Sequence, residues 1–127
     1  MIFDSNKERG NAGLAIAIAY FGANGYTVSV PLNDTQDYDL IVEINGELQK
    51  VQIKATGYKT NGNYTVNLKS AGGTKGTIYK RVNETKVDLL FVLCENMDMY
   101  LIPKEEFLKY SSSMSLNESR KKYKVYL

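Results

Sequence analysis

The spacing of hydrophobic and polar residues along this chain predicts one long helix followed by several strands. Residues 5–25, with the sequence SNKERGNAGLAIAIAYFGANG, begin with a capping box formed by Ser5 and Glu8. Apolar residues then recur at helical spacing until two glycines near the end of the segment. Beyond this helix the pattern changes to short apolar segments bounded by turn residues, which are typical of strands. We place the first strand at residues 26–31.

The segment DYDLIVEINGELQKVQIKA predicts a β-hairpin with strands at residues 38–44 and 48–55. Its centre is the dipeptide Asn45-Gly46, which favours a tight two-residue turn. One face of the hairpin is then apolar throughout, and a register shift of a single residue would expose it, so burial supports this register independently of the turn. The apolar positions are Leu40, Val42, Ile44, Val51, Ile53 and Ala55.

The rest of the chain continues this mixture of strands and short helices. A second Asn-Gly turn leads into a strand at 63–68, and the glycine-rich, basic residues 69–86 predict a long loop with at most one short helical turn. The other elements follow in order. We expect a buried strand at 88–94, its partner at 99–103, a short helix at 104–110, a linker or second short helix at 111–119, and a last strand at 122–127. This order predicts an α/β fold with a helix followed by a mixed β-sheet and flanking helices.

Composition limits the kind of protein and the chemistry. A chain of 127 residues with 43% hydrophobic residues suits a single domain over residues 1–127. It has no run of about 18 apolar residues and no secretory signal, so we expect a cytoplasmic protein with no membrane partner. The absence of histidine excludes Ser/His and Cys/His nucleophile pairs. The lone Cys94 is expected to be a buried hydrophobe, which leaves carboxylates, Lys, Tyr and hard cations for hydrolysis.

Charge is distributed unevenly along the chain. The net charge of +2 combines −5 over residues 1–47 with +7 over residues 48–127. The stretch 49–82 contains seven basic residues and no acidic residue. Such a stretch indicates either a surface for a polyanion or a solvated loop region in a lysine-rich protein, and charge alone does not choose between them.

The polar face of the predicted hairpin gathers residues that could hold a metal ion. In the register set by the turn, Asp39 faces Gln52, and Lys54 lies on the same face two residues further on. The Asp39 carboxylate, the Gln52 amide oxygen and the Ile53 carbonyl are oxygen ligands suited to Mg²⁺ or Mn²⁺. The Lys54 ammonium could orient a water molecule or stabilise charge on a phosphoryl oxygen. An ordinary exposed face with a salt bridge is the commoner reason for so short a pattern.

A family resemblance adds to this interpretation. The segments GYTVSVPLNDTQDYDLIV and VQIKAT resemble the PD-(D/E)xK nuclease superfamily, most of all its branch of endonucleases associated with group I introns. GGTKG and DLLFVLCENMDMYLIP are similar to that branch as well, so the resemblance covers residues 5–107. Residues 108–127 would form a C-terminal helix and strand extension and a candidate oligomer contact.

The resemblance implies a fold, a set of site residues and an activity. It implies an α-β-β-β-α-β core with an Asp at the start of the second strand and a (D/E/Q)-x-K on the third, and Asp39, Gln52 and Lys54 occupy these positions. The implied activity is divalent-metal-dependent cleavage of DNA by homodimers or higher homo-oligomers. Two roles stay open within this class: a homing endonuclease that reads a duplex sequence and a Holliday-junction resolvase that recognises branched DNA.

Two departures from the family pattern bear on the site. Gln52 stands where most of the superfamily has Glu or Asp, so the site has one negative charge fewer. The first helix often adds a Glu, for which Glu8 is the only candidate, and Glu8 also serves the capping box. A non-cleaving DNA-binding module that retains the nuclease fold is therefore the alternative function.

The basic stretch supplies candidates for DNA contacts. Lysine and arginine side chains suit phosphate, and tyrosines can bond the backbone or pack against sugars. Each tyrosine has an alternative role in the core, because the chain has ten tyrosines and no tryptophan. The DNA-binding candidates are Lys59, Lys69, Lys75, Lys80, Arg81, Tyr58 and Tyr79.

Overall fold

The long N-terminal helix forms as its capping signal predicts. The structure is a computed structural model that describes residues 4–33, 35–71, 79–81 and 86–127. Helix α1 (Asn6–Ala23) starts after Ser5, whose hydroxyl accepts a hydrogen bond from the Glu8 N–H at 3.1 Å. The Glu8 carboxylate in turn accepts a hydrogen bond at 3.2 Å from the N–H of Asp4, the residue before the N-cap.

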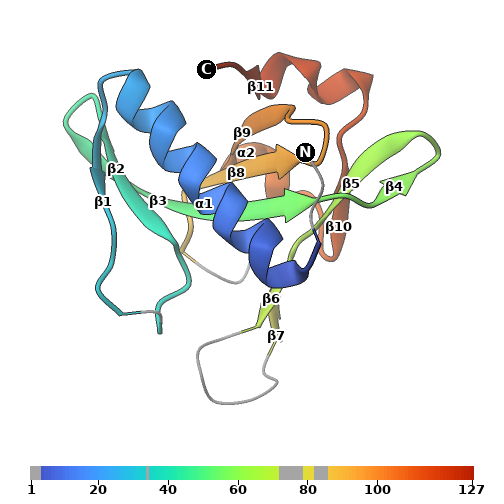
Figure 1. Ribbon diagram of the computed structural model, residues 1–127, viewed down its shortest axis with the longest axis horizontal. Coiled ribbons are helices and arrows are strands. Elements are labelled where there is room, and N and C mark those ends of the chain that lie inside the picture. Colours follow the sequence, from blue (N-terminus) through green and yellow to red (C-terminus); the bar gives the residue numbers. More distant parts are fainter. Residues whose placement is uncertain (1–3, 34, 72–78, 82–85) are drawn as a thin grey trace.

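A six-stranded mixed sheet forms the centre of the molecule, in the order β1-β2-β3-β8-β9-β11 (Figure 1). Its strands are β1 (Thr27–Ser29), β2 (Leu40–Ile44), β3 (Glu47–Thr56), β8 (Leu89–Cys94), β9 (Met99–Pro103) and β11 (Lys124–Val125). Strands β3 and β8 run parallel, and the other neighbours in this sheet are antiparallel. Each predicted strand of this sheet is confirmed, and the last one completes the sheet by pairing with β9.

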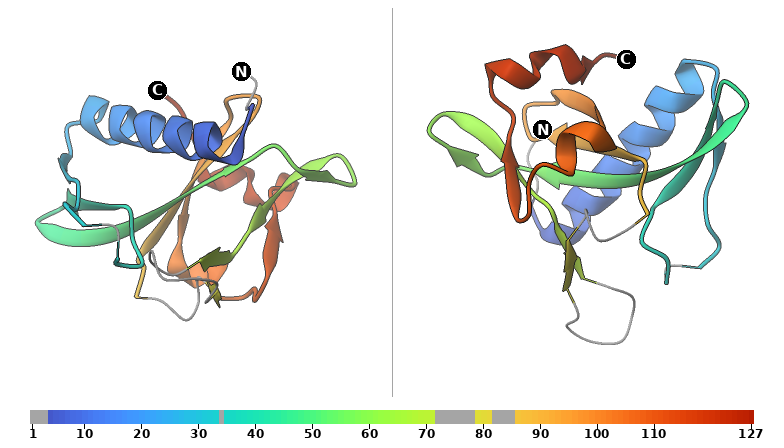
Figure 2. Two further views of the ribbon diagram at one scale, coloured as in Figure 1. Left: turned by 60° about the horizontal axis from the view of Figure 1, so that its bottom comes forward. Right: turned by 180° about the vertical axis from the view of Figure 1, so that it is seen from behind.

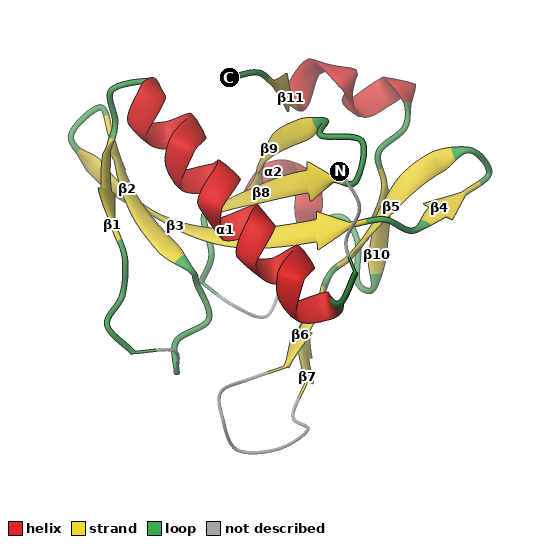
Figure 3. Ribbon diagram, in the orientation of Figure 1, coloured by secondary structure: helices red, strands yellow, loops and turns green. Residues whose placement is uncertain are grey.

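Smaller elements cover the side of the sheet opposite α1, as Figures 2 and 3 show. Strands β4 (Lys59–Thr60), β5 (Asn63–Asn67) and β10 (Ser113–Ser115) form a second sheet in the order β10-β5-β4. Strands β6 (Lys69–Ala71) and β7 (Tyr79–Arg81) form a two-stranded ribbon. Helix α2 (Lys104–Phe107) and the 3₁₀-helix η2 (Glu118–Tyr123) complete this layer.

The central sheet is buried on both faces, which explains the almost wholly apolar sequence of β8. On the α1 face, Phe21 of the helix packs in one cluster with Val51 and Phe91. On the other face, Leu90 packs with Phe107 and with Met114 of β10. The lone Cys94 is buried in this second cluster, as predicted.

The structure corrects three sequence predictions. Residues 111–119 are not simply a linker or a helix, because Ser113–Ser115 form β10 against β5 and turn Met114 into the core. Residues 69–86 are not a loop throughout, because their described parts pair as β6 and β7 and so satisfy their backbone polar groups. Between β3 and β8 the described residues contain strands where the resemblance implies a helix.

Candidate active site

The hairpin that carries the candidate site has the predicted register. Asn45 and Gly46 have φ values of 53° and 81°, which match the two positive values of a type I′ turn. Strand β2 begins at Leu40, which lies opposite Val51 of β3. The strand register ends at this pair, and the Asp39 N–H donates to the Val51 carbonyl, so the register changes at Asp39 and its opposition to Gln52 stays a prediction.

The Asp39 carboxylate occupies the point where β2 and β3 separate. Its Oδ2 accepts a hydrogen bond from the Ile53 N–H at 2.7 Å, and the Asp39 N–H donates to the Val51 carbonyl at 2.8 Å. The side chain thus replaces the backbone partner that a longer β2 would offer to Ile53. Because the N–H and C=O of a strand residue point to the same edge, the Ile53 carbonyl also lies on the Asp39 side. Two of the three predicted oxygen ligands therefore share one edge of β3.

Gln52 and Lys54 lie on the face of β3 turned away from α1. Gln52 is only 7% exposed, because β5 packs against β3 and the second layer covers this face. Lys54 is half-buried, and its Nζ donates a hydrogen bond to the Lys69 carbonyl at 2.9 Å. The polar face predicted from the hairpin is thus confirmed, but it lines the interior of a layered structure and is not an ordinary exposed surface.

Asp39 and Lys54 each affect the pKa of the other. Asp39 is open to solvent as a residue, and burial by the surrounding protein still raises the pKa of its carboxyl, while the Ile53 hydrogen bond and Lys54 oppose this shift. Burial lowers the pKa of Lys54, and the nearby Asp39 charge opposes this shift. The negative charge of Asp39 and the positive charge of Lys54 therefore stabilise each other, while burial disfavours both charged forms.

The donor set fits a hard divalent cation. It combines the Asp39 carboxylate, the Gln52 side-chain amide and the Ile53 carbonyl, all of which are ligand types that Mg²⁺ accepts. In the part of the chain that the structure describes, no three His, Cys, Asp or Glu residues gather as a metal cluster. A metal at this place would therefore depend on the amide and backbone oxygens beside one carboxylate.

Glu8 lies in the first turn of α1 and is exposed. Its N–H donates to the Ser5 hydroxyl as the capping box predicts, whereas its carboxylate accepts from Asp4, the residue before the N-cap. A role for Glu8 at the metal stays a prediction.

The candidate DNA-binding residues have different positions. Tyr58 and Lys69 line a pocket beside Lys54, whereas the exposed Lys59 places its ammonium 4.8 Å from the centre of the Tyr64 ring. Tyr79, Lys80 and Arg81 form β7, with side chains outside the described part of the chain, and Lys75 lies outside the described residues altogether.

Arg9 of α1 also lines this pocket, and the sequence interpretation did not single it out. Nothing local in the sequence connects a first-turn helix residue with the end of β3, because the contact depends on how α1 packs across the sheet.

The comparisons with known proteins agree with this fold of a helix packed on a mixed sheet. The sequence model of the PD-(D/E)XK endonuclease family matches residues 4–125, and the chain belongs to that family. Its structure is similar to that of the bacterial homing endonuclease I-Ssp6803I, with 28% sequence identity and a TM-score of 0.74. The similarity covers 92% of this chain and 81% of the other. No curated protein sequence matches the chain.

The predicted family and fold class are thus confirmed. Within the described residues, α1 and the shorter helices are not long and apolar enough to cross a membrane.

Proposed function

We propose that the protein is a divalent-metal-dependent DNA endonuclease of the homing type. The observation that carries this proposal is the placement of the Asp39 carboxylate, which is held on the edge of β3 by the Ile53 N–H, beside the face of β3 that carries Gln52 and Lys54. Membership of an endonuclease family and similarity to a homing endonuclease support the proposal.

In this proposal the chain's own residues bind the ion and prepare the attack. Asp39, Gln52 and the Ile53 carbonyl would hold Mg²⁺ or Mn²⁺, which lowers the pKa of bound water and offsets phosphoryl charge when it is present. The burial of Gln52 fixes its amide against β3. Lys54 positions the attacking water for in-line displacement and stabilises negative charge that develops on the phosphoryl oxygens.

Cleavage assays with matched variants test the assignment. Wild-type protein should cut DNA with Mg²⁺ or Mn²⁺ and not with EDTA. Asp39→Ala and Lys54→Ala should abolish cleavage while folding and most DNA binding persist. The controls are Glu47→Ala, an exposed acid of the same hairpin, and Lys50→Ala, which removes a lysine from the same face of β3. Cleavage by either site variant at a rate near that of the wild type would refute the assignment.

The choice of substrate separates the candidate roles. Linear duplex, plasmid and four-way-junction DNA should be compared under the same metal conditions. The similar homing endonuclease favours sequence-dependent cutting of duplex DNA. Preferential cutting of the junction would support a resolvase role, and metal-independent binding without any cutting would support a non-cleaving module.

The proposal also includes an electrostatic footprint and an assembly. If about six phosphates are contacted, the log-log slope of affinity against salt should be near −5 for duplex DNA. A slope near about −1 would contradict such a footprint. We propose a homodimer or larger homo-oligomer as the active form, because two-strand cleavage needs two sites, and sedimentation with and without DNA would test it.

A further inference from the structure

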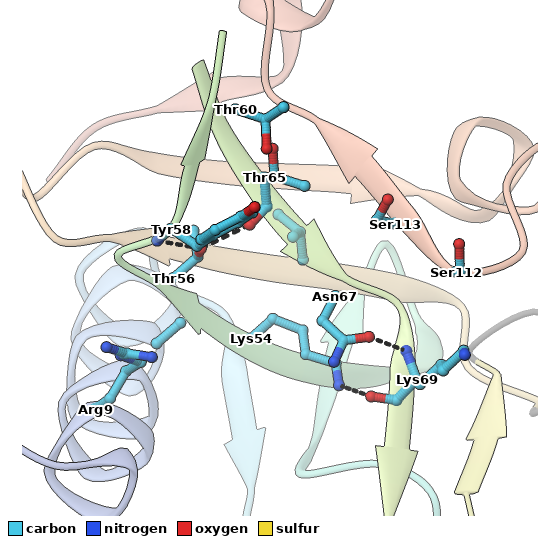
Figure 4. Close-up of a pocket in the computed structure, with 12 residues that line it drawn as sticks. Arg9, Lys54, Thr56, Tyr58, Thr60, Thr65, Asn67, Lys69, Ser112 and Ser113 are labelled. Atoms are coloured by element: carbon cyan, nitrogen blue, oxygen red, sulfur yellow. Dashed lines mark hydrogen bonds between the residues drawn. The ribbon is translucent and has the colours of Figure 1, made fainter. Parts of the chain in front are cut away.

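A pocket of about 630 Å³ opens beside Lys54 (Figure 4). Its walls come from the end of β3, the β4–β5 hairpin, the start of β6, the segment before β10 and the first turn of α1. Figure 4 shows the Lys54 side chain crossing it towards the Lys69 carbonyl, with Arg9 approaching from α1. The pocket is therefore continuous with the face of β3 that carries the candidate active site.

The lining of this pocket suits an anionic ligand. Three of its side chains are cationic, those of Arg9, Lys54 and Lys69, and there is no carboxylate among the described residues that line it. Its other polar groups are threonine, serine and tyrosine hydroxyls and the amide of Asn67, which can donate hydrogen bonds to phosphate or to sugar oxygens.

Gly57 leaves room for the Glu95 carboxylate close to the Arg9 guanidinium. A Cβ atom at Gly57 would collide with the Glu95 carboxylate, and the Arg9 Nη2 lies 3.5 Å from the same point. The Glu95 carboxylate therefore occupies the room left by the missing side chain, and the Arg9 guanidinium lies beside it at an ordinary contact distance from that point. This arrangement places a planar donor group, suited to phosphate, at the end of β3.

The position and size of the pocket indicate which anion it takes. It falls within the range of roughly 300–1,000 Å³ found for small-ligand pockets, which is larger than a lone phosphate needs. Lys54 belongs both to the pocket and to the candidate active site, so a strand whose phosphate lies at Asp39 would place its neighbouring nucleotide here. Tyr58, which is 68% exposed at this pocket, offers a ring on which a base can stack.

We propose that this pocket binds the nucleotide next to the scissile phosphate, with Arg9 and Lys69 directed to its phosphate and Tyr58 to its base. This assignment rests on the proposed endonuclease function and adds to it a subsite for the cut strand. It makes Arg9 a substrate-contacting residue of the helix that covers the opposite face of the sheet.

A metal-free binding experiment tests the pocket separately from cleavage. The full chain, labelled with ¹⁵N and kept in EDTA, would be titrated with thymidine 3′,5′-bisphosphate while amide shifts are followed by NMR. We expect shifts at Thr56, Tyr58 and Asn67. Arg9→Gln should raise the Kd by about 10-fold or more, because it removes a charge-assisted contact. The control Lys7→Gln removes the same charge from an exposed position of α1 and should change the Kd by less than about twofold.

One further variant and one control ligand distinguish a nucleotide subsite from simple phosphate binding. Tyr58→Ala truncates a largely exposed side chain, so it should leave the fold intact and still weaken binding. If inorganic phosphate binds as tightly as the bisphosphate, or if the pocket amides do not respond, the nucleotide subsite is refuted. Binding at the pocket by a wild-type protein that cuts no DNA would instead refute the proposed function and, with it, the assignment to a cut strand, and would show a nucleotide-binding pocket.

Discussion

At the scale of single residues, Asp39 and Lys54 combine a cost in stability with a role in the proposed chemistry. Burial raises the pKa of Asp39 above its usual 3.8 and lowers that of Lys54 below its usual 10.5. Both shifts mean that the folded protein disfavours the charged forms that metal binding and catalysis need. The pair is therefore a place where replacing a functional group should affect activity and stability in opposite directions.

Asp39→Asn is expected to lower the cleavage rate by about 100-fold or more while raising the thermal midpoint of unfolding at neutral pH. The asparagine oxygen can still accept the Ile53 N–H, and the disfavoured charge is gone. Because the folded-state pKa is raised, the wild type loses stability as the pH rises from 3.8 through that pKa, and the variant should lack this loss. Calorimetry across acid pH measures it, with Glu43→Gln of β2 as the control. A midpoint lower than that of the wild type would contradict the prediction.

Lys54→Arg is expected to change the alkaline side of the pH–rate profile. The wild-type rate should fall at a pH below 10.5, since the lowered pKa of Lys54 makes the ammonium lose its proton early. Arginine stays charged throughout this range, so the variant, although slower, should keep a flat alkaline limb. The wild-type fold should gain stability as the pH rises through the lowered pKa towards 10.5. An identical alkaline limb in both proteins would exclude Lys54 as its origin.

At the scale of elements, α1 packs against the face of β3 opposite Gln52 and Lys54 and so supports the strand that carries the candidate site. A Cβ at Gly13 would lie 3.0 Å from the Ile53 Cγ2 and 3.5 Å from the Ala55 Cβ, whereas a Cβ at Gly10 would meet nothing within 4 Å. The two glycines of one helix thus form a matched pair, of which only Gly13 is needed for close packing.

Gly10→Ala should stabilise the fold by about 0.5–1 kcal/mol, because alanine favours a helix interior. Gly13→Ala should destabilise it, because the overlap with Ile53 costs about 1–3 kcal/mol and exceeds that gain. Since Ile53 supplies the N–H that holds Asp39, the Gly13 variant should also cut more slowly. Chemical denaturation and cleavage rates test both changes. Equal stabilisation by the two alanines would show that β3 yields freely to the helix.

The hairpin and its register could be predicted because one local signal determines many partners. Once Asn45 and Gly46 form the turn, the pairs from Ile44 and Glu47 to Leu40 and Val51 follow. The first helix could also be predicted from the sequence, since its capping residues lie within four positions of one another. Local chemistry determines these features, and no distant contact is needed.

The second layer and the pocket could not be predicted, because they depend on distant segments. In and just after β10, Met114 and Leu116 are the alternating apolar residues, which is too short a pattern to identify a strand. The burial of Gln52 follows from β5 packing over β3, and the place of Arg9 follows from the path of α1. Such contacts bring together residues that share no local pattern.

At the scale of the whole molecule, the C-terminal segment supplies edge strands to the six-stranded and the three-stranded sheet. Strand β10 pairs with β5, and β11 pairs with β9. Met114 is 1% exposed, and the Arg120 Nε lies 3.3 Å from the Glu106 carboxylate, which links η2 to α2. Residues 108–127 therefore contact the rest of the structure through both β10 and the η2–β11 segment.

Removal of residues 108–127 is expected to abolish cooperative unfolding, because it uncovers the core around Phe107 and one edge of each sheet. Removal of Tyr126 and Leu127 alone, which are 67% and 65% exposed, should change stability by no more than about 0.5 kcal/mol. Circular dichroism during urea unfolding compares the two truncations. A cooperative transition in the shorter chain would show that the core is self-sufficient without this segment.

The single thiol of the chain has a practical consequence. Cys94 is fully buried, and burial raises its pKa to about 12, so it stays unreactive towards thiol reagents near neutral pH. A cysteine introduced at an exposed position such as Ser113, at the rim of the pocket, would then take a fluorophore alone. Because Cys94 stays unlabelled, the fluorescence of this one label would report DNA binding at the pocket.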